Sequence, residues 1–127
     1  MAIRIELSLR LPNSPGALAR VCQALVDERV NILAMALEGG GMLRLVVDNP
    51  VHAAGALQER QYAVSERDVL FIQLPNDTGS LYRASRLLAG AGVNIDYAYG
   101  SALEDHDMAA IVVGVEDAQR ASAAAGV

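Results

Sequence analysis

The chain opens with a regular alternation of apolar and polar side chains. Its apolar members are Ile3, Ile5, Leu7 and Leu9, and charged or hydroxyl residues separate them. A period of two is typical of a strand with one buried face. Pro12 breaks the pattern, Ser14 suits a helix N-cap, and Pro15 suits the first helical position, where no N–H is needed. The pattern therefore predicts a strand over residues 3–9 and a helix that begins near residue 15.

The next stretch has the spacing of a helix with one apolar face. Its apolar residues, at i, i+3, i+4, i+7 and i+8, are Leu18, Val21, Cys22, Leu25 and Val26. Further patterns predict strands over 32–37 and 42–47, a helix over 51–60 and a fourth strand over 62–64. The order is βαββαβ. It predicts an α+β fold of the ferredoxin-like kind, a four-stranded antiparallel sheet with both helices on one face.

The same pattern occurs again 63 positions further along the chain, without gaps. Residues 9–37 and 72–100 are identical at ten of 29 positions, and the shared residues include turn residues as well as apolar ones. An internal repeat of this kind indicates two tandem modules. The second copy predicts strands over 69–74, 95–100 and 108–115 and a helix over 116–125, which leaves no residues for its own fourth strand.

We therefore expect two modules, over residues 1–67 and 68–127, joined by a short linker at 65–68. The second module has an unfilled sheet edge, with unpaired backbone donors and acceptors. Either another segment or another chain should cover that edge, or the edge stays weakly ordered. A homodimer is the simplest assembly that would do so.

Composition narrows the partners and the chemistry. Of the 127 residues, 53% are hydrophobic and 20% are charged, which predicts a packed core, and the net charge of -5 disfavours nucleic acid and anionic membranes as partners. The N-terminus lacks the features of a signal peptide or anchor, so we expect a cytoplasmic protein. The glycines at 39–41 predict a hairpin and not a phosphate loop, and the four polar residues at 104–107 predict a solvated hairpin tip. We expect neither metal nor cofactor.

A resemblance to a known family rests on the repeated motif. Each copy reads Leu-Pro-Asn-x-x-Gly-x-Leu, followed by a predicted helix and then Val-Asn-Ile. This resembles the ACT domain, a regulatory unit of phosphoglycerate dehydrogenase, aspartate kinase and acetohydroxyacid synthase. The resemblance covers nearly the whole chain, twice. It implies modules that bind amino acids where paired domains meet and that signal to an enzyme or transcriptional regulator. One departure is Arg29, where the family usually has glycine, as at Gly92.

Candidate ligand-binding residues come from the chemistry of a free amino acid, which needs acceptors for its ammonium and donors for its carboxylate. A helix N-terminus offers N–H donors, glycine permits close approach, and an asparagine amide both donates and accepts. The candidates are Asn13, Ser14, Gly16, Asn31, Asn76, Asp77, Gly79 and Asn94. The asparagines and glycines could instead serve as turn or capping residues. We expect Leu18, Leu81 and Ile95 to be core residues.

The resemblance further implies that the two asparagines of one site come from different modules. Asn13 with Gly16 would face Asn94, and Asn76 with Gly79 would face Asn31.

Three classes of function remain. The first is an amino-acid-sensing regulatory protein that is not an enzyme and acts on a separate partner. The second is a structural or interaction module without a ligand. The third is a small ferredoxin-like enzyme such as an acylphosphatase, which would need an arginine in the first strand-to-helix loop, whereas Arg20 and Arg83 fall within the predicted helices.

Overall fold

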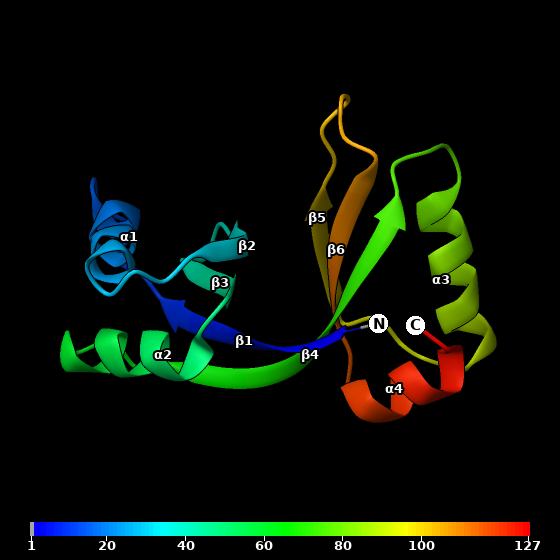
Figure 1. The fold of residues 1–127 in the computed structure, drawn as a ribbon. Coiled ribbons are helices and arrows are strands. Elements are labelled where there is room, and N and C mark those ends of the chain that lie inside the picture. Colours follow the sequence, from blue (N-terminus) through cyan, green and yellow to red (C-terminus); the bar gives the residue numbers. More distant parts are fainter. Residues whose placement is uncertain (1) are drawn as a thin grey trace. The chain divides into compact units, whose positions relative to one another are not determined.

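The computed structural model describes residues 2–127, and Figure 1 shows their helices and strands. In chain order the elements are β1 (Ala2–Arg10), α1 (Ala17–Asp27), β2 (Ile32–Leu37), β3 (Met42–Val47), α2 (Pro50–Glu59), β4 (Ser65–Pro75), α3 (Ser80–Gly90), β5 (Tyr97–Ser101), β6 (Met108–Gly114) and α4 (Ala118–Ala125).

The chain divides into two compact units. The first unit consists of residues 5–67, and the second consists of residues 68–127 together with residues 2–4. The strand order is β2-β3-β1-β4 in the first unit and β1-β4-β6-β5 in the second, so β1 and β4 each supply residues to both. Each unit has the strand order of a ferredoxin-like sheet, which confirms the predicted fold class. The module boundary between residues 67 and 68 stays a prediction.

Antiparallel pairing sets the register within each unit. In the first, Leu7 pairs with Leu45, which also pairs with Met35, and in the second Ile72 pairs with Ile111. Alternate residues of these strands lie under the helices and form a separate core in each unit. A fully buried leucine contributes about 1.5–3 kcal/mol. The first core includes Leu7, Leu9, Val21, Leu25, Leu43, Leu45 and Leu57, and the second includes Leu70, Ile72, Leu88, Val113, Val115 and Ala118.

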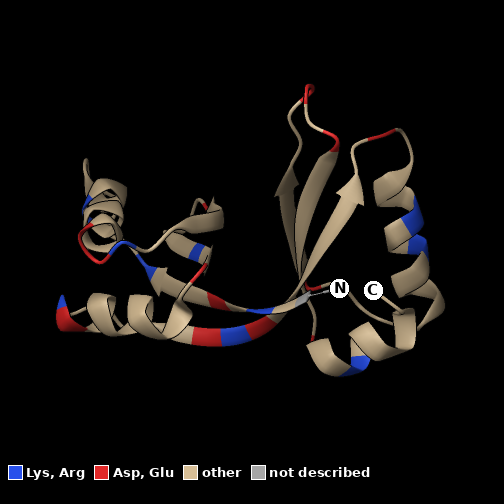
Figure 2. Ribbon diagram, viewed as in Figure 1, with Lys and Arg blue, Asp and Glu red and all other residues tan. Residues whose placement is uncertain are grey.

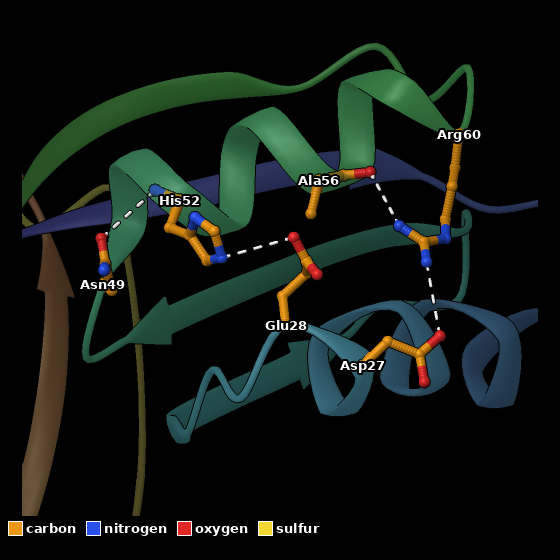
Figure 3. A network of polar contacts seen from close by, with 6 residues as sticks. All are labelled: Asp27, Glu28, Asn49, His52, Ala56 and Arg60. Carbon is orange, nitrogen blue, oxygen red and sulfur yellow. Dashed lines mark hydrogen bonds and ion pairs between the residues drawn. The ribbon is translucent and has the colours of Figure 1, made fainter.

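Polar contacts join the two helices of the first unit (Figure 3). Asn49 caps α2 by accepting a hydrogen bond from the backbone N–H of His52, at 3.2 Å. The Nε2 atom of His52 lies 3.3 Å from Glu28 Oε1, and Arg60 Nη2 lies 3.4 Å from Asp27 Oδ2. Because these side chains are well exposed, each pair contributes at most about 1 kcal/mol. The apolar core, and not these pairs, holds α1 and α2 on the sheet.

The predicted fourth strand over 62–64 and the linker over 65–68 are both wrong. Strand β4 begins at Ser65 and continues without interruption to Pro75. No glycine or proline interrupts residues 65–74, so nothing in the backbone stops the extended conformation. One long strand therefore serves as the last strand of the first unit and the leading strand of the second. Tyr62 and Val64 precede it and pack against the first core.

The open edge predicted for the second module is covered by another segment of the same chain. Residues 2–4 of β1 belong to the second unit, where β1 is the neighbour of β4. Ile3 packs against the second core, and the guanidinium carbon of Arg4 lies 5.4 Å from the centre of the Phe71 ring. Of the three predicted alternatives, cover by another segment of the chain is thus the one found.

The predicted start of the first helix is also wrong. The N-cap of α1 is Gly16 and not Ser14, and Pro15 precedes the helix. The backbone N–H of Ser14 instead bonds to the carbonyl of Pro12, at 2.9 Å, so the chain turns once more before the helix begins. In the second unit, α4 begins at Ala118 and not at 116, because the side chain of Asp117 accepts from the N–H of Arg120.

Two of the three predicted core leucines and isoleucines lie on the surface. Leu18 packs against the first core as expected. Leu81 and Ile95 are instead 57% and 44% exposed, so that part of the prediction is wrong. The repeat keeps the same residue type at corresponding positions of the two copies. Whether that residue is buried depends on its neighbours, and these differ between the two units.

Candidate functional site

The strand-to-helix loop of the first unit borders a cavity of about 420 Å³. Its walls are this loop, the first turn of α1 and the hairpin between β2 and β3. Arg10 Nη1 donates to the carbonyl of Gly40 at 2.6 Å, and the N–H of Leu11 donates to the carbonyl of Gly41 at 2.7 Å. These hydrogen bonds hold the hairpin beside the loop. We call this space the first-loop cavity, and its polar lining residues are Asn13, Ser14 and Glu38.

Both loop glycines have the left-handed backbone that other residues adopt only at a cost. Gly16 has φ 82° and Gly79 has φ 95°, and each is the N-cap of its helix. A Cβ atom at Gly16 would lie 3.3 Å from Arg20 Nη1, and one at Gly79 would lie 3.1 Å from Arg83 Nη1. Glycine therefore permits both the turn and the approach of the arginine. Both arginines belong to helices, as predicted, yet their guanidinium groups reach back to the loop.

The second loop contains a carboxylate that the first lacks. Asp77 Oδ1 accepts hydrogen bonds from Ser80 Oγ and, at 2.9 Å, from Arg83 Nη2. The hydrogen bond from Ser80, followed by that from Arg83, holds the pKa of the Asp77 carboxyl below its usual value. Figure 2 marks acidic residues in red, including one in the loop between β4 and α3, and basic residues along α3 in blue. Asp77 is therefore ionised and bound to its own chain at neutral pH.

The two loop asparagines have different surroundings. Asn76 Nδ2 donates to the carbonyls of Leu103 and His106, both at 2.8 Å, and so ties the loop to the hairpin between β5 and β6. The side chain of Asn13 is exposed, and among residues 2–127 it has no hydrogen-bond partner. The hairpin of the second unit is three residues longer and reaches the asparagine, whereas the short glycine hairpin of the first unit does not.

The strand asparagines lie far from the loop asparagines of the same unit. Asn31 precedes β2, which begins opposite Val47, whereas the first-loop cavity lies where β2 ends opposite Leu43. Five residues of extended strand separate these ends, which is about 16 Å. Asn94 likewise precedes β5, which begins opposite Gly114, whereas Asn76 follows the last residue of β4, which pairs with Met108 at the other end of β6. Neither unit brings its two asparagines together.

Glu38 was not among the residues predicted from sequence. It lines the first-loop cavity, is about half exposed, and accepts from Arg44 Nε at 2.7 Å. Its carboxylate supplies an acceptor for an ammonium group on the side of the cavity that faces the loop. The residue is absent from the repeated motif, so only the fold of the hairpin could reveal it.

A larger cavity of about 670 Å³ lies in the second unit, along β4 and α3. Ser80 and Arg83 reach it, but most of its lining is apolar, and it is not lined by Asn76, Asp77 or Gly79. Within residues 2–127, no group of three or more histidine, cysteine, aspartate or glutamate side chains is arranged to hold a metal ion. Over the same residues, every helix is too short or too polar to cross a membrane.

A family model described as an ACT domain pair matches residues 1–124. The chain belongs to this ACT domain pair family. Protein BT0572 from Bacteroides thetaiotaomicron is similar in both sequence and structure, with 30% identity and a TM-score of 0.87 over 96% of this chain and 85% of that one. The family expected from the motif is thereby confirmed, and with it the regulatory, amino-acid-binding class of domain.

Aspartate kinases supply further structural neighbours. The ligand-free regulatory subunit of aspartate kinase from Thermus thermophilus is 19% identical, with a TM-score of 0.72 over 98% of this chain and 92% of that chain. Aspartokinase III from E. coli, in complex with lysine and aspartate, is 16% identical, with a TM-score of 0.59 over 99% of this chain and 32% of that chain. At these identities the likeness shows the shared fold. A comparison with curated proteins gave no match.

Proposed function

We propose that this ACT domain pair senses a free amino acid and modulates a separate enzyme or transcriptional regulator, with no catalytic activity of its own. The observation that carries the proposal is the first-loop cavity. It combines donors for a carboxylate, an acceptor for an ammonium group and a volume of about 420 Å³, within the range of about 300–1,000 Å³ typical of small-molecule sites.

The first turn of α1 suits the carboxylate of an amino acid. Among residues 2–127, the backbone N–H groups of Leu18 and Ala19 have no acceptor. A helix N-terminus attracts an anion through such groups and through its partial positive charge. The amide of Asn13 and the guanidinium of Arg20 add side-chain donors at the same end of the helix. Glu38, on the opposite wall, accepts from the ammonium.

A second copy of the chain completes the proposed site. Neither unit holds a loop asparagine near a strand asparagine. A ligand that contacts both kinds of asparagine therefore takes the strand asparagine from outside that unit, and in a homodimer the second chain supplies it. An apolar surface supports this assembly. Three large apolar side chains of the edge strand β2 are exposed, Leu33, Met35 and Leu37, at 39%, 41% and 46%. An exposed apolar edge strand favours pairing with another chain.

The similar structure of aspartokinase III from E. coli is a complex with lysine and aspartate, and this supports a free amino acid as the ligand class. A thermal-shift screen of the full chain against each of the twenty amino acids tests the proposal, followed by calorimetric titration of those that raise the melting temperature. At least one should stabilise the protein, because a ligand that binds the folded state shifts unfolding by mass action. Asn13→Ala should weaken its binding, while Gln58→Ala, which removes an exposed amide from α2, should leave binding unchanged.

Absence of stabilisation by all twenty amino acids would contradict the proposal and favour an interaction module without a ligand. Hydrolysis of an acyl phosphate by the purified chain would instead favour the enzyme alternative.

A further inference from the structure

The two strand-to-helix loops share a motif but differ at several positions, and two of these differences give the second loop new internal contacts. Ser14 and Ala17 of the first unit correspond to Asp77 and Ser80 of the second. The arginine one turn into the helix is present in both units, and in both it lies against the loop glycine. These two differences place the carboxylate of Asp77 and the hydroxyl of Ser80 next to an arginine that both units possess.

The added groups bind one another. Asp77 accepts from Ser80 Oγ and from Arg83 Nη2, and Arg83 Nη2 lies 3.1 Å from the same hydroxyl. Ser80 is buried at 5% exposure, so its hydroxyl is fixed within the loop. The carboxylate stands at the start of α3, where the helix dipole favours a negative charge. Arg83 is thus neutralised by an anion of its own chain.

The first loop has none of these internal partners. Arg20 forms no ion pair with any carboxylate among residues 2–127, and Asn13 has no hydrogen-bond partner there. Asn76, by contrast, donates both amide hydrogens to the hairpin between β5 and β6. Two separate features, the carboxylate and the asparagine, therefore leave the side-chain donors of the first loop free and those of the second loop already in use. The backbone N–H groups of Leu81 and Tyr82, like those of Leu18 and Ala19, have no acceptor among residues 2–127, so the side chains make the difference.

We infer that Asp77 is a built-in substitute for a ligand carboxylate, so that a free amino acid binds at the first loop alone and each chain takes up one molecule. This inference rests on the proposed function, and it places the amino-acid site at the first of the two strand-to-helix loops. A ligand carboxylate at the second loop would be repelled by Asp77 and would have to displace it from Arg83 and Ser80. Removal of Asp77 should open a second, latent site on α3.

Amide chemical shifts in ¹⁵N-labelled protein report on each loop separately. Glycine is the probe, because it presents only the α-ammonium and α-carboxylate groups that both loops would recognise. In the wild-type chain, glycine should shift the amide signals of Leu18 and Ala19 and leave those of Leu81 and Tyr82 unchanged. In Asp77→Ser, which gives the second loop the residue of the first, glycine should shift all four signals.

A reciprocal variant and a control complete the experiment. Ser14→Asp combined with Ala17→Ser builds the Asp77 arrangement into the first loop, and glycine should no longer shift Leu18 and Ala19. Asp105→Ser removes the same charge from the exposed hairpin between β5 and β6 and should keep the wild-type pattern. Melting curves establish that each variant is folded, and Asp77→Asn replaces Asp77→Ser if the serine variant is not.

The outcomes separate the inference from the proposed function. Shifts at both loops of the wild-type chain would overturn the inference and support the function. Failure of the Asp77 variant to gain shifts at Leu81 and Tyr82 would also overturn the inference, whatever the first loop does. No shift at either loop of the wild-type chain, together with no stabilising amino acid in the thermal screen, would overturn the proposed function.

Discussion

Arg29 and Gly92 occupy the same position after α1 and α3, and both have a left-handed backbone, with φ 56° and 71°. The surrounding hydrogen bonds are also the same. The N–H of Val30 bonds to the carbonyl of Leu25 at 2.9 Å, and that of Val93 bonds to the carbonyl of Leu88 at 3.0 Å. This is the Schellman ending of a helix, which requires a left-handed residue and strongly favours glycine. The departure at Arg29 therefore changes the residue and leaves the geometry intact.

We predict that Arg29→Gly stabilises the protein by about 1 kcal/mol, the typical cost of a left-handed backbone for a residue with a Cβ. Arg29 is exposed, so the substitution removes no buried contact. The reverse change, Gly92→Arg, should destabilise the protein by a similar amount. Denaturant unfolding of both variants measures the two effects. A lower stability for Arg29→Gly would show that the arginine side chain contributes more than its backbone costs.

A matched pair of substitutions distinguishes the two loop asparagines. Asn76→Ala removes two hydrogen bonds to the hairpin between β5 and β6, so it should reduce stability by about 1–3 kcal/mol, given about 0.5–1.5 kcal/mol for each. Asn13→Ala removes no internal bond, so it should leave stability unchanged and weaken amino-acid binding by about 1–3 kcal/mol, the cost of an unpaired charged group. Unfolding and calorimetric titration measure both properties, and equal stability losses would contradict the assignment.

Asp77 should make stability depend on pH in the acid range. Its pKa in the folded chain is lowered by the hydrogen bonds from Ser80 and Arg83. A lowered folded-state pKa stabilises the fold above the unfolded value, about 3.9 for aspartate, and that stabilisation is lost as the pH falls through the folded-state pKa. Asp77→Asn should therefore be less stable than the wild type at neutral pH, and the difference should shrink below about pH 4.

Melting curves of both proteins between neutral and strongly acid pH measure this difference, with Asp105→Asn as the control at an exposed position. A constant difference across the whole range would show that the hydrogen bonds, and not the charge, account for the effect.

Much of the fold follows from local patterns. The bounds of β2 and β3 match the predicted strands residue for residue, because the glycines at 39–41 mark the turn between two apolar segments. Such patterns do not predict that β1 and β4 each supply residues to both units. Residues 65–68 have no breaker that separates a linker from a strand, and whether residues 2–4 lie in the first or the second unit depends on long-range packing at Ile3.

The candidate site was less accessible from sequence. The repeat identified the asparagines and glycines, but identical residues in a motif do not have identical partners. The difference between Asn13 and Asn76 arises from the length of a hairpin that is distant in sequence. The motif places Asp77 among the ligand-binding candidates, whereas its bonds to Ser80 and Arg83 depend on side-chain conformations that the motif does not specify. Glu38 reaches the first-loop cavity only through the fold of the hairpin.

The last prediction concerns self-association through β2. Met35 is the middle one of the three exposed apolar residues of this edge strand, and the corresponding residue of the edge strand β5 is the small Ala98. Met35→Lys places a charge where two β2 strands would meet, and a buried, unpaired charge is strongly unfavourable. We therefore expect it to shift the proposed homodimer toward monomer. Ala98→Lys introduces the same charge on the other edge and should leave the dimer intact.

Sedimentation equilibrium over a range of protein concentrations measures the association of the wild type and both variants. Because the proposed site takes its strand asparagine from the second chain, Met35→Lys should also weaken amino-acid binding, and the ligand should strengthen the wild-type dimer through the same linkage. Melting temperatures at low protein concentration show whether the variant monomer remains folded. A dimer that persists in Met35→Lys, or a wild-type chain that stays monomeric at every concentration, would contradict an interface at β2.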